Sequence, residues 1–313
     1  MGSRTGEPAT IKLLLAFAAI YIVWGSTFLA IRFAVETLPP LLMMGTRHLV
    51  AGSVLLIWLL ARGGPRPERR LWIPALICGA FCFLGCHSLL AWAELYVPSG
   101  LAALLSASLP IWMVLLARFH GQESELTPKV LSGIAIGLIG VGILVPFSMR
   151  GEGRELLAAI AIVIGEMSWA VGAIFGRGVR TTTSPSTFAA MQMICGGALL
   201  WIAGLGLGEA SGLHAPAFTA KSLLSLAYLI VLGSLVTFTA YTWLLQVSSP
   251  AIVSTHSYVN PVIAVILGWA LAGEQVTVRT MLGAAIILAS VGLVSVRRRR
   301  APLPEEVAAE ASS

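Results

Sequence analysis

The residues that could do chemistry in this chain are few, and most lie within long apolar runs. Glu166 stands near the middle of one run, and Arg47 stands about eight residues into another. An ionisable side chain is costly in a hydrocarbon environment, so each indicates function by default. Glu166 is a candidate proton carrier, or else a neutral hydrogen-bonding group. Arg47 is either a functional cation or a residue that fixes helix packing by snorkelling or by pairing with a loop.

A second set of polar residues lies beside prolines within the apolar runs. Ser108 precedes Pro110 by two positions, and Asn260 directly precedes Pro261. Each proline removes an intrahelical hydrogen bond and frees a carbonyl group, which a nearby polar side chain can approach. We therefore expect both prolines to interrupt their helices at matching depths and to mark a binding site.

Imidazole, carboxyl and aromatic side chains complete the candidate site. His87 lies in one apolar run and Glu94 stands at its end, while His256 and Tyr258 lie in the run that contains Asn260. A lone buried histidine is more often a structural group than a ligand, and both readings stay open. Aromatic residues within other runs include Trp24, Trp92, Trp169, Tyr241 and Trp243. A cavity with aromatic walls and few fixed charges suits amino acids, organic cations or flat drug-like solutes.

Motifs for enzyme or cofactor chemistry are missing from the sequence. All 14 acidic residues are glutamate, so paired aspartates for proteolysis or diphosphate chemistry are excluded. Neither HExxH nor GxSxG occurs, and no Gly-Lys pair exists from which to build a P-loop. Cys78, Cys82 and Cys86 share one helix face, where packing is the better interpretation than a soft-metal site. We predict no enzyme activity, no cofactor, no metal and no nucleic-acid partner.

The composition determines which solvent these elements face. Hydrophobic residues make up 57% of the chain, charged residues 11%, and the mean hydropathy is +0.89. A soluble protein carries about 25% charged residues, so most of this surface must face lipid. A bilayer core requires roughly 20 apolar residues per helix. Ten runs meet that requirement: Ile11–Ala34, Pro40–Ala61, Leu71–Ala93, Ser99–Phe119, Lys129–Phe147, Glu155–Gly176, Pro185–Leu207, Ser222–Leu245, Pro250–Ala272 and Thr280–Val296. The prediction is an all-α polytopic membrane protein.

The basic residues between these runs predict the orientation. With the N-terminus inside, 14 Lys and Arg residues lie on the cytoplasmic side and 5 on the outer side. The inner set is Arg4, Lys12, Arg62, Arg66, Arg69, Arg70, Arg118, Lys129, Arg177, Arg180 and Arg297 to Arg300; the outer set is Arg32, Arg150, Arg154, Lys221 and Arg279. The excess of positive charge inside places both termini in the cytoplasm.

The two halves of the chain repeat one another. A shift of 145 residues places Trp24 on Trp169 and Arg47 on Gln192, and one of 151 places Pro110 on Pro261. Five helices per repeat is an odd number, so the second repeat enters the membrane from the opposite side, and a site is expected near the midplane between the repeats. We predict a cytoplasmic N-terminus at 1–10, repeats at 11–147 and 155–296, and a basic-then-acidic cytoplasmic tail at 297–313. Gly133 and Gly137 form a GxxxG motif that favours close helix packing.

Four segments together resemble a bacterial drug/metabolite transporter of the EamA type. They read YIVWGSTFLAIRFAVETLPP, AELYVPSGLAALLSASLP, LSGIAIGLIGVGIL and SSPAIVSTHSYVNPVIAVILGWALAGE. The resemblance covers roughly residues 11 to 296, so both halves take part. In such proteins a Glu often precedes the Thr between the fourth and fifth helices of each repeat. Glu274 fits this pattern, whereas Ser124, with Glu123 beside it, occupies the position in the first half.

The resemblance implies export of metabolites, amino acids or toxic compounds across a bacterial inner membrane. It places Trp24, His87, Pro110, Trp169, Tyr241, Tyr258 and Asn260 around a central cavity, and Glu94 matches a recurring pattern near the outer end of the third helix. The predicted cavity also includes Ser108, His256 and Pro261, from the polar residues and prolines described above. The expected partners are the lipid bilayer, a small organic solute and a coupling ion such as H+, with the chain a monomer or a weak homodimer. Import of a sugar or nucleotide-like solute is the alternative within transport, and a channel, a receptor or an intramembrane enzyme is the alternative outside it.

Overall fold

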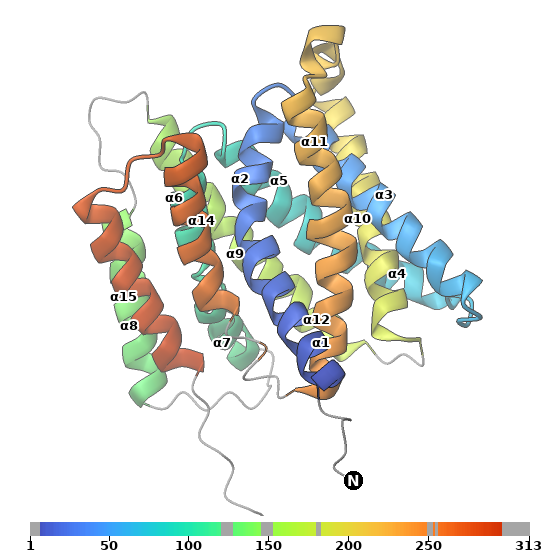
Figure 1. The fold of residues 1–313 in the computed structure, drawn as a ribbon, viewed down its shortest axis with the longest axis horizontal. Coiled ribbons are helices and arrows are strands. Elements are labelled where there is room, and N and C mark those ends of the chain that lie inside the picture. The colour runs from blue at the N-terminus through green and yellow to red at the C-terminus, as the bar shows by residue number, and fades with distance from the viewer. Residues whose placement is uncertain are drawn as a thin grey trace, which may run out of the picture.

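The computed structural model describes residues 7–119, 128–144, 153–179, 183–248, 253 and 256–295. Within these ranges every regular element is a helix, and the helices form one bundle (Figure 1). Seven helical segments are long and apolar enough to cross a bilayer, and three shorter apolar helices lie at 131–144, 259–272 and 278–290. These segments correspond to the ten predicted runs, so the expected all-α polytopic fold is confirmed.

The first half forms spans 1 to 5, and only spans 2 and 5 are single helices. Span 1 combines α1 (Glu7–Ala18), η1 (Ala19–Val23) and α2 (Trp24–Val35), and span 2 is α3 (Pro40–Ala61). Span 3 combines η2 (Arg69–Leu71), α4 (Trp72–Gly79), η3 (Ala80–His87) and α5 (Ser88–Ala93). Span 4 consists of α6 (Ser99–Ser106) and α7 (Leu109–Phe119), and span 5 is α8 (Pro128–Leu144).

The second half forms spans 6 to 10. Spans 6 and 7 are α9 (Arg154–Gly178) and α10 (Pro185–Gly206), followed by the short turns η4 (Glu209–Gly212) and η5 (Ala215–Ala217). Span 8 combines α11 (Ala220–Tyr228), η6 (Leu229–Val236) and α12 (Thr237–Val247). Spans 9 and 10 contain α14 (His256–Ala272) and α15 (Val278–Ser295).

The main contacts between spans of the first half and spans of the second half have counterparts in which the two halves change places. Span 2 packs against its counterpart span 7 as α3 on α10, and span 5 packs against span 10 as α8 on α15, at opposite edges of the bundle (Figure 1). Span 1 packs against span 9, and span 6 likewise packs against span 4. Inverted repeats related by a two-fold axis require this exchange.

The interior spans depart from regular α-helix at matching places. The segments η1, η3 and η6 are π-helical, and η3 and η6 occupy the same position in spans 3 and 8. A π-helical segment shifts the backbone hydrogen bonds by one residue and is frequently found at functional sites. The repeats therefore agree in backbone geometry within the spans that flank their interface.

The two prolines behave differently within the described residues. Span 4 is interrupted between α6 and α7, and Pro110 is the second residue of α7, as predicted. Pro261 instead lies inside the continuous helix α14. It is the sixth residue of that helix, where its missing amide costs a single hydrogen bond near the helix start, so the helix continues past it.

Close approach of backbones joins the edge helices. A Cβ atom on Gly137 of α8 would lie 2.3 Å from Ser290 Oγ of α15, so the GxxxG motif faces another helix of the same chain. Gly133 is buried in the same helix. The outer surface of the bundle is apolar, with Ile57, Ile73 and Trp269 each more than 60% exposed, as a lipid-facing surface requires.

The described chain begins and ends at the same end of the bundle. Helix α1 starts and helix α15 finishes at the lower end in Figure 1. An even number of crossings produces this arrangement. Residues 1–6 of the predicted N-terminal segment 1–10 and all of the predicted tail 297–313 lie outside the described residues, as do Ser124 and Glu123.

Candidate solute site between the two halves

The Trp24 group joins spans 1, 8 and 9. The Trp24 ring centroid lies 5.3 Å from Tyr241 and 5.0 Å from His256, and its Nε1 donates to Gly233 O at 3.0 Å. All three rings are half-buried. The π-helical segment η6 presents the Gly233 carbonyl to Trp24, and small Gly25 allows α2 to approach Ile263 of α14 closely. The predicted residues Trp24, Tyr241 and His256 are therefore neighbours.

The Trp169 group joins spans 2, 3 and 6. The Trp169 ring lies 5.2 Å from His87 and 5.9 Å from Phe83, which belong to η3. His48 Nε2 and His87 Nδ1 are 2.7 Å apart and share one hydrogen. Trp24 and Trp169 are repeat counterparts, and each packs against the π-helical segment of the opposite half. Neither His48 nor Phe83 was predicted from the sequence, although an imidazole beside Arg47 in an apolar run could have marked His48.

Arg47 lies between these two groups. Its Nε donates to Ser234 Oγ of η6 at 3.1 Å, and its side chain is only 6% exposed. It therefore neither snorkels to the membrane surface nor pairs with a loop, because Ser234 in span 8 provides a partner within the bundle. Its counterpart Gln192 lies in α10 at the contact with α4 and α9, where its carbonyl approaches Gly79.

Glu166 faces the cysteine side of span 3. Cys86 Sγ donates to Glu166 Oε1 at 3.9 Å, and Cys82 and Cys78 approach the carbonyl groups of Trp169 and Gly172 one and two turns further along α9. All three thiols are buried and unlinked. Among the described residues no group of three potential ligands could hold a metal ion. The cysteines thus pack span 3 against span 6.

Charged groups meet at the end of the bundle where spans 3 and 4 join. Arg32 donates to Glu94 O at 2.9 Å and to Val97 O at 2.8 Å, and its Nε lies 3.6 Å from Glu274 Oε1. Glu274 accepts hydrogen bonds from both the amide and the hydroxyl of Ser99, at the start of α6. The Glu94 carboxyl is buried without a hydrogen-bond partner among the described residues, and this burial raises its pKa well above the ordinary value.

The remaining predicted residues divide between the interior and the helix breaks. The Asn260 amide, turned so that its nitrogen faces η1, lies 3.1 Å from Ile20 O and from Tyr21 O. It thus donates to two backbone carbonyls of the π-helical segment η1. Ser108 is buried at the break before α7. The side chain of Tyr258 lies outside the described residues.

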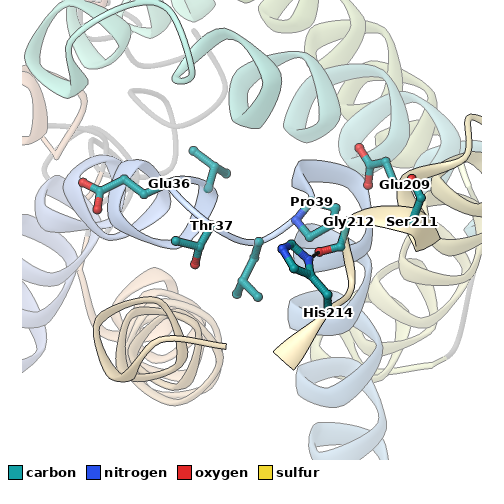
Figure 2. Close-up of a pocket in the computed structure, with 9 residues that line it drawn as sticks. Glu36, Thr37, Pro39, Glu209, Ser211, Gly212 and His214 are labelled. Atoms are coloured by element: carbon teal, nitrogen blue, oxygen red, sulfur yellow. Dashed lines mark hydrogen bonds between the residues drawn. The ribbon is translucent and has the colours of Figure 1, made fainter. Parts of the chain in front are cut away.

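A cleft of about 340 Å³ lies at the opposite end of the bundle from the start of α1. Residues of the α2–α3 connection, including Glu36, Thr37 and Pro39, form one side, and Glu209, Ser211 and His214 form the other (Figure 2). Glu209 accepts hydrogen bonds from the amides of Leu41 and Leu42, so its carboxylate caps the N-terminus of α3. None of the predicted site residues lines this cleft.

The comparison with known proteins agrees with this architecture. The sequence profile of the EamA-like transporter family matches residues 10–145 and again 156–296. The chain is 36% identical over 305 residues to the uncharacterized inner membrane transporter YedA of Escherichia coli (strain K12), covering 95% of each chain. It is 27% identical over 280 residues to a "Probable amino-acid metabolite efflux pump" of the same strain, covering 86% of this chain and 90% of the relative.

A solved structure described as "Crystal structure of protein" shares the fold. Its TM-score is 0.60 at 20% identity, and the alignment covers 91% of this chain and 97% of the other. The family match, the named relatives and the helical fold together identify a polytopic membrane transporter. The chain belongs to the EamA-like transporter family.

Proposed function

We propose that this protein is a secondary active exporter of small organic metabolites, amino acids among them, working by alternating access in the bacterial inner membrane with both termini cytoplasmic. The observation that carries the proposal is the seam between the halves. There Trp24 and Trp169, counterparts in the two repeats, are each half-buried and each pack against further rings. The amino-acid metabolite efflux pump among the relatives supports export as the direction.

Alternating access requires the two halves to exchange conformations about a fixed site. The π-helical segments η3 and η6 are suited to this movement, because a wider helical turn has fewer well-aligned hydrogen bonds to break. They lie beside Trp169 and Trp24, so a change in either segment acts directly on a ring group.

The test is an efflux and resistance screen in cells with and without the protein, using amino acids and cationic toxicants. Trp169→Ala and Asn260→Ala should lower efflux of the identified solute at least about tenfold while membrane insertion stays normal, since each removes several contacts of the seam. Gly142→Ala is the matched control, because a Cβ atom there meets nothing within 4 Å. Normal flux in both seam variants would refute the assignment of the site.

Coupling to a proton gradient would use Glu166, the acidic side chain buried in the middle of span 6. Glu166→Gln preserves the shape of the side chain and removes its ability to ionise. The variant should transport solute without responding to an imposed pH gradient in liposomes. An unchanged response to the gradient would exclude Glu166 as the proton carrier.

A further inference from the structure

Arg47 carries a buried charge that the fold does not neutralise by contact. Its hydrogen-bond partners are the hydroxyl of Ser234 and, at 3.9 Å, the thioether of Met44, both uncharged. Within the described part of the chain Arg47 forms no ion pair. A cation without a contacting counter-ion is expensive at membrane depth, so a structural role alone explains it poorly.

The surroundings of Arg47 identify where a counter-ion would lie. Its Nη2 lies against Gly233 of η6, at 3.6 Å from the position of an added Cβ, and the Gly233 carbonyl accepts from Trp24. His48 and His87, the latter packed on Trp169, also lie within electrostatic range of Arg47. Arg47 is thus the charged group common to both ring groups.

Two buried polar groups nearby also lack partners among the described residues. One is His48 Nδ1, on the residue adjacent to Arg47, and the other is the carboxyl of Glu94, which lies within electrostatic range of Arg47 without contacting it. A folded protein interior rarely leaves buried polar atoms without a hydrogen-bond partner unless a ligand or water provides one. The region around Arg47 therefore has the properties of a binding site.

We infer that Arg47 is the carboxylate-binding residue of the seam, and that the transported solute carries a carboxylate which pairs with this guanidinium. This inference rests on the proposed transport function and names the chemical group that the site recognises. The guanidinium binds a carboxylate through two parallel hydrogen bonds, a geometry that lysine cannot reproduce. The Trp169 group accommodates the apolar part of the solute.

The experiment compares solutes that differ only in their charged groups. Purified protein in liposomes is offered phenylalanine, 2-phenylethylamine, which lacks the carboxylate, and 3-phenylpropionate, which lacks the ammonium group, and then the corresponding three compounds with the leucine side chain. We expect the wild-type protein to transport the carboxylates in preference to the amines. Arg47→Gln should weaken carboxylate transport at least about tenfold and change amine transport little.

Two further variants separate recognition from structure. Arg47→Lys keeps the charge but loses the forked geometry, so its carboxylate transport should lie between those of the wild-type protein and Arg47→Gln. Ser234→Ala removes the bond between spans 2 and 8 but keeps the guanidinium, so it should preserve the preference for carboxylates. Equal losses for acids and amines in all three variants would show that Arg47 only ties the two spans together, and would overturn the inference.

The outcomes also distinguish this inference from the proposed function. Transport of amines in preference to carboxylates, or of only a solute from the efflux screen that has no carboxylate, leaves an exporter and refutes carboxylate recognition by Arg47. The absence of any transport across the six compounds and the screen refutes both.

Discussion

Replacement of Glu274 by alanine tests how the two halves are fastened at the end of the bundle. Its carboxylate is 9% exposed and accepts from Ser99 N at 2.7 Å, from Ser99 Oγ at 2.8 Å and from Gly100 N at 3.0 Å. Ser99 is itself fully buried. Glu274 belongs to the connection between spans 9 and 10, whereas Ser99 and Gly100 begin span 4, so one side chain links the second half to the first.

The expected loss follows from the groups that Glu274→Ala would leave unpaired. Two buried amides at the start of α6 lose their acceptor, at about 1–3 kcal/mol each. The cap that Glu274 provides at the start of α6 consists of these same hydrogen bonds, so losing the cap adds no further free-energy cost. Because neighbouring residues and water recover part of this, we expect unfolding to be easier by about 3–4 kcal/mol. Glu274→Gln keeps one acceptor oxygen and should lose about half as much.

Glu36→Ala is the matched control. Glu36 accepts from Lys221 Nζ at 2.7 and 2.8 Å, distances as short as those of Glu274, but the two side chains are 45% and 49% exposed. Solvent and salt screen such a pair, so its loss should cost less than about 1 kcal/mol. Reversible unfolding by sodium dodecyl sulfate in mixed micelles measures both variants. A Glu274→Ala loss within about 1 kcal/mol of the control would refute the reasoning that burial decides the difference.

Three further predictions concern packing, pH and topology. Gly172→Val should destabilise span 6 by about 2–4 kcal/mol, because its Cβ would lie 2.6 Å from Cys82 Sγ. Gly178→Ala, whose Cβ would meet nothing within 4 Å, should leave unfolding in micelles unchanged. Equal free energies of unfolding for the two variants would contradict this prediction. The raised pKa of Glu94 makes the folded state bind its proton more tightly than the unfolded state, so stability should fall as pH rises above the unfolded value of about 4.3. Glu94→Gln should flatten that dependence, and an unchanged pH profile would remove Glu94 as its source. Arg69→Cys, beside Arg70, should react with an impermeant maleimide only from the cytoplasm, and labelling of intact cells would reverse the proposed orientation.

Several elements follow directly from local sequence. The run predicted at Pro40–Ala61 is the observed α3, and that predicted at Pro185–Leu207 ends one residue later than α10. Proline at the first helical position and hydropathy summed over some twenty residues determine these bounds. The break in span 4 was predictable from Pro110, because proline removes an intrahelical hydrogen bond. The continuity of α14 through Pro261 depends instead on how few residues precede this proline in the helix.

The partners of the polar residues were decided by tertiary structure. The sequence identified Arg47 as an unusual cation, but its acceptor Ser234 lies 187 positions away, and His48 meets His87 only because spans 2 and 3 pack side by side. Similarly, the pattern around Glu274 did not reveal that it caps span 4. Hydropathy and helix breaks are local properties that can be read along one chain segment, and they determine which residues enter the membrane. Which side chains meet there depends on the distance and rotation between packed helices, and only the folded bundle specifies these.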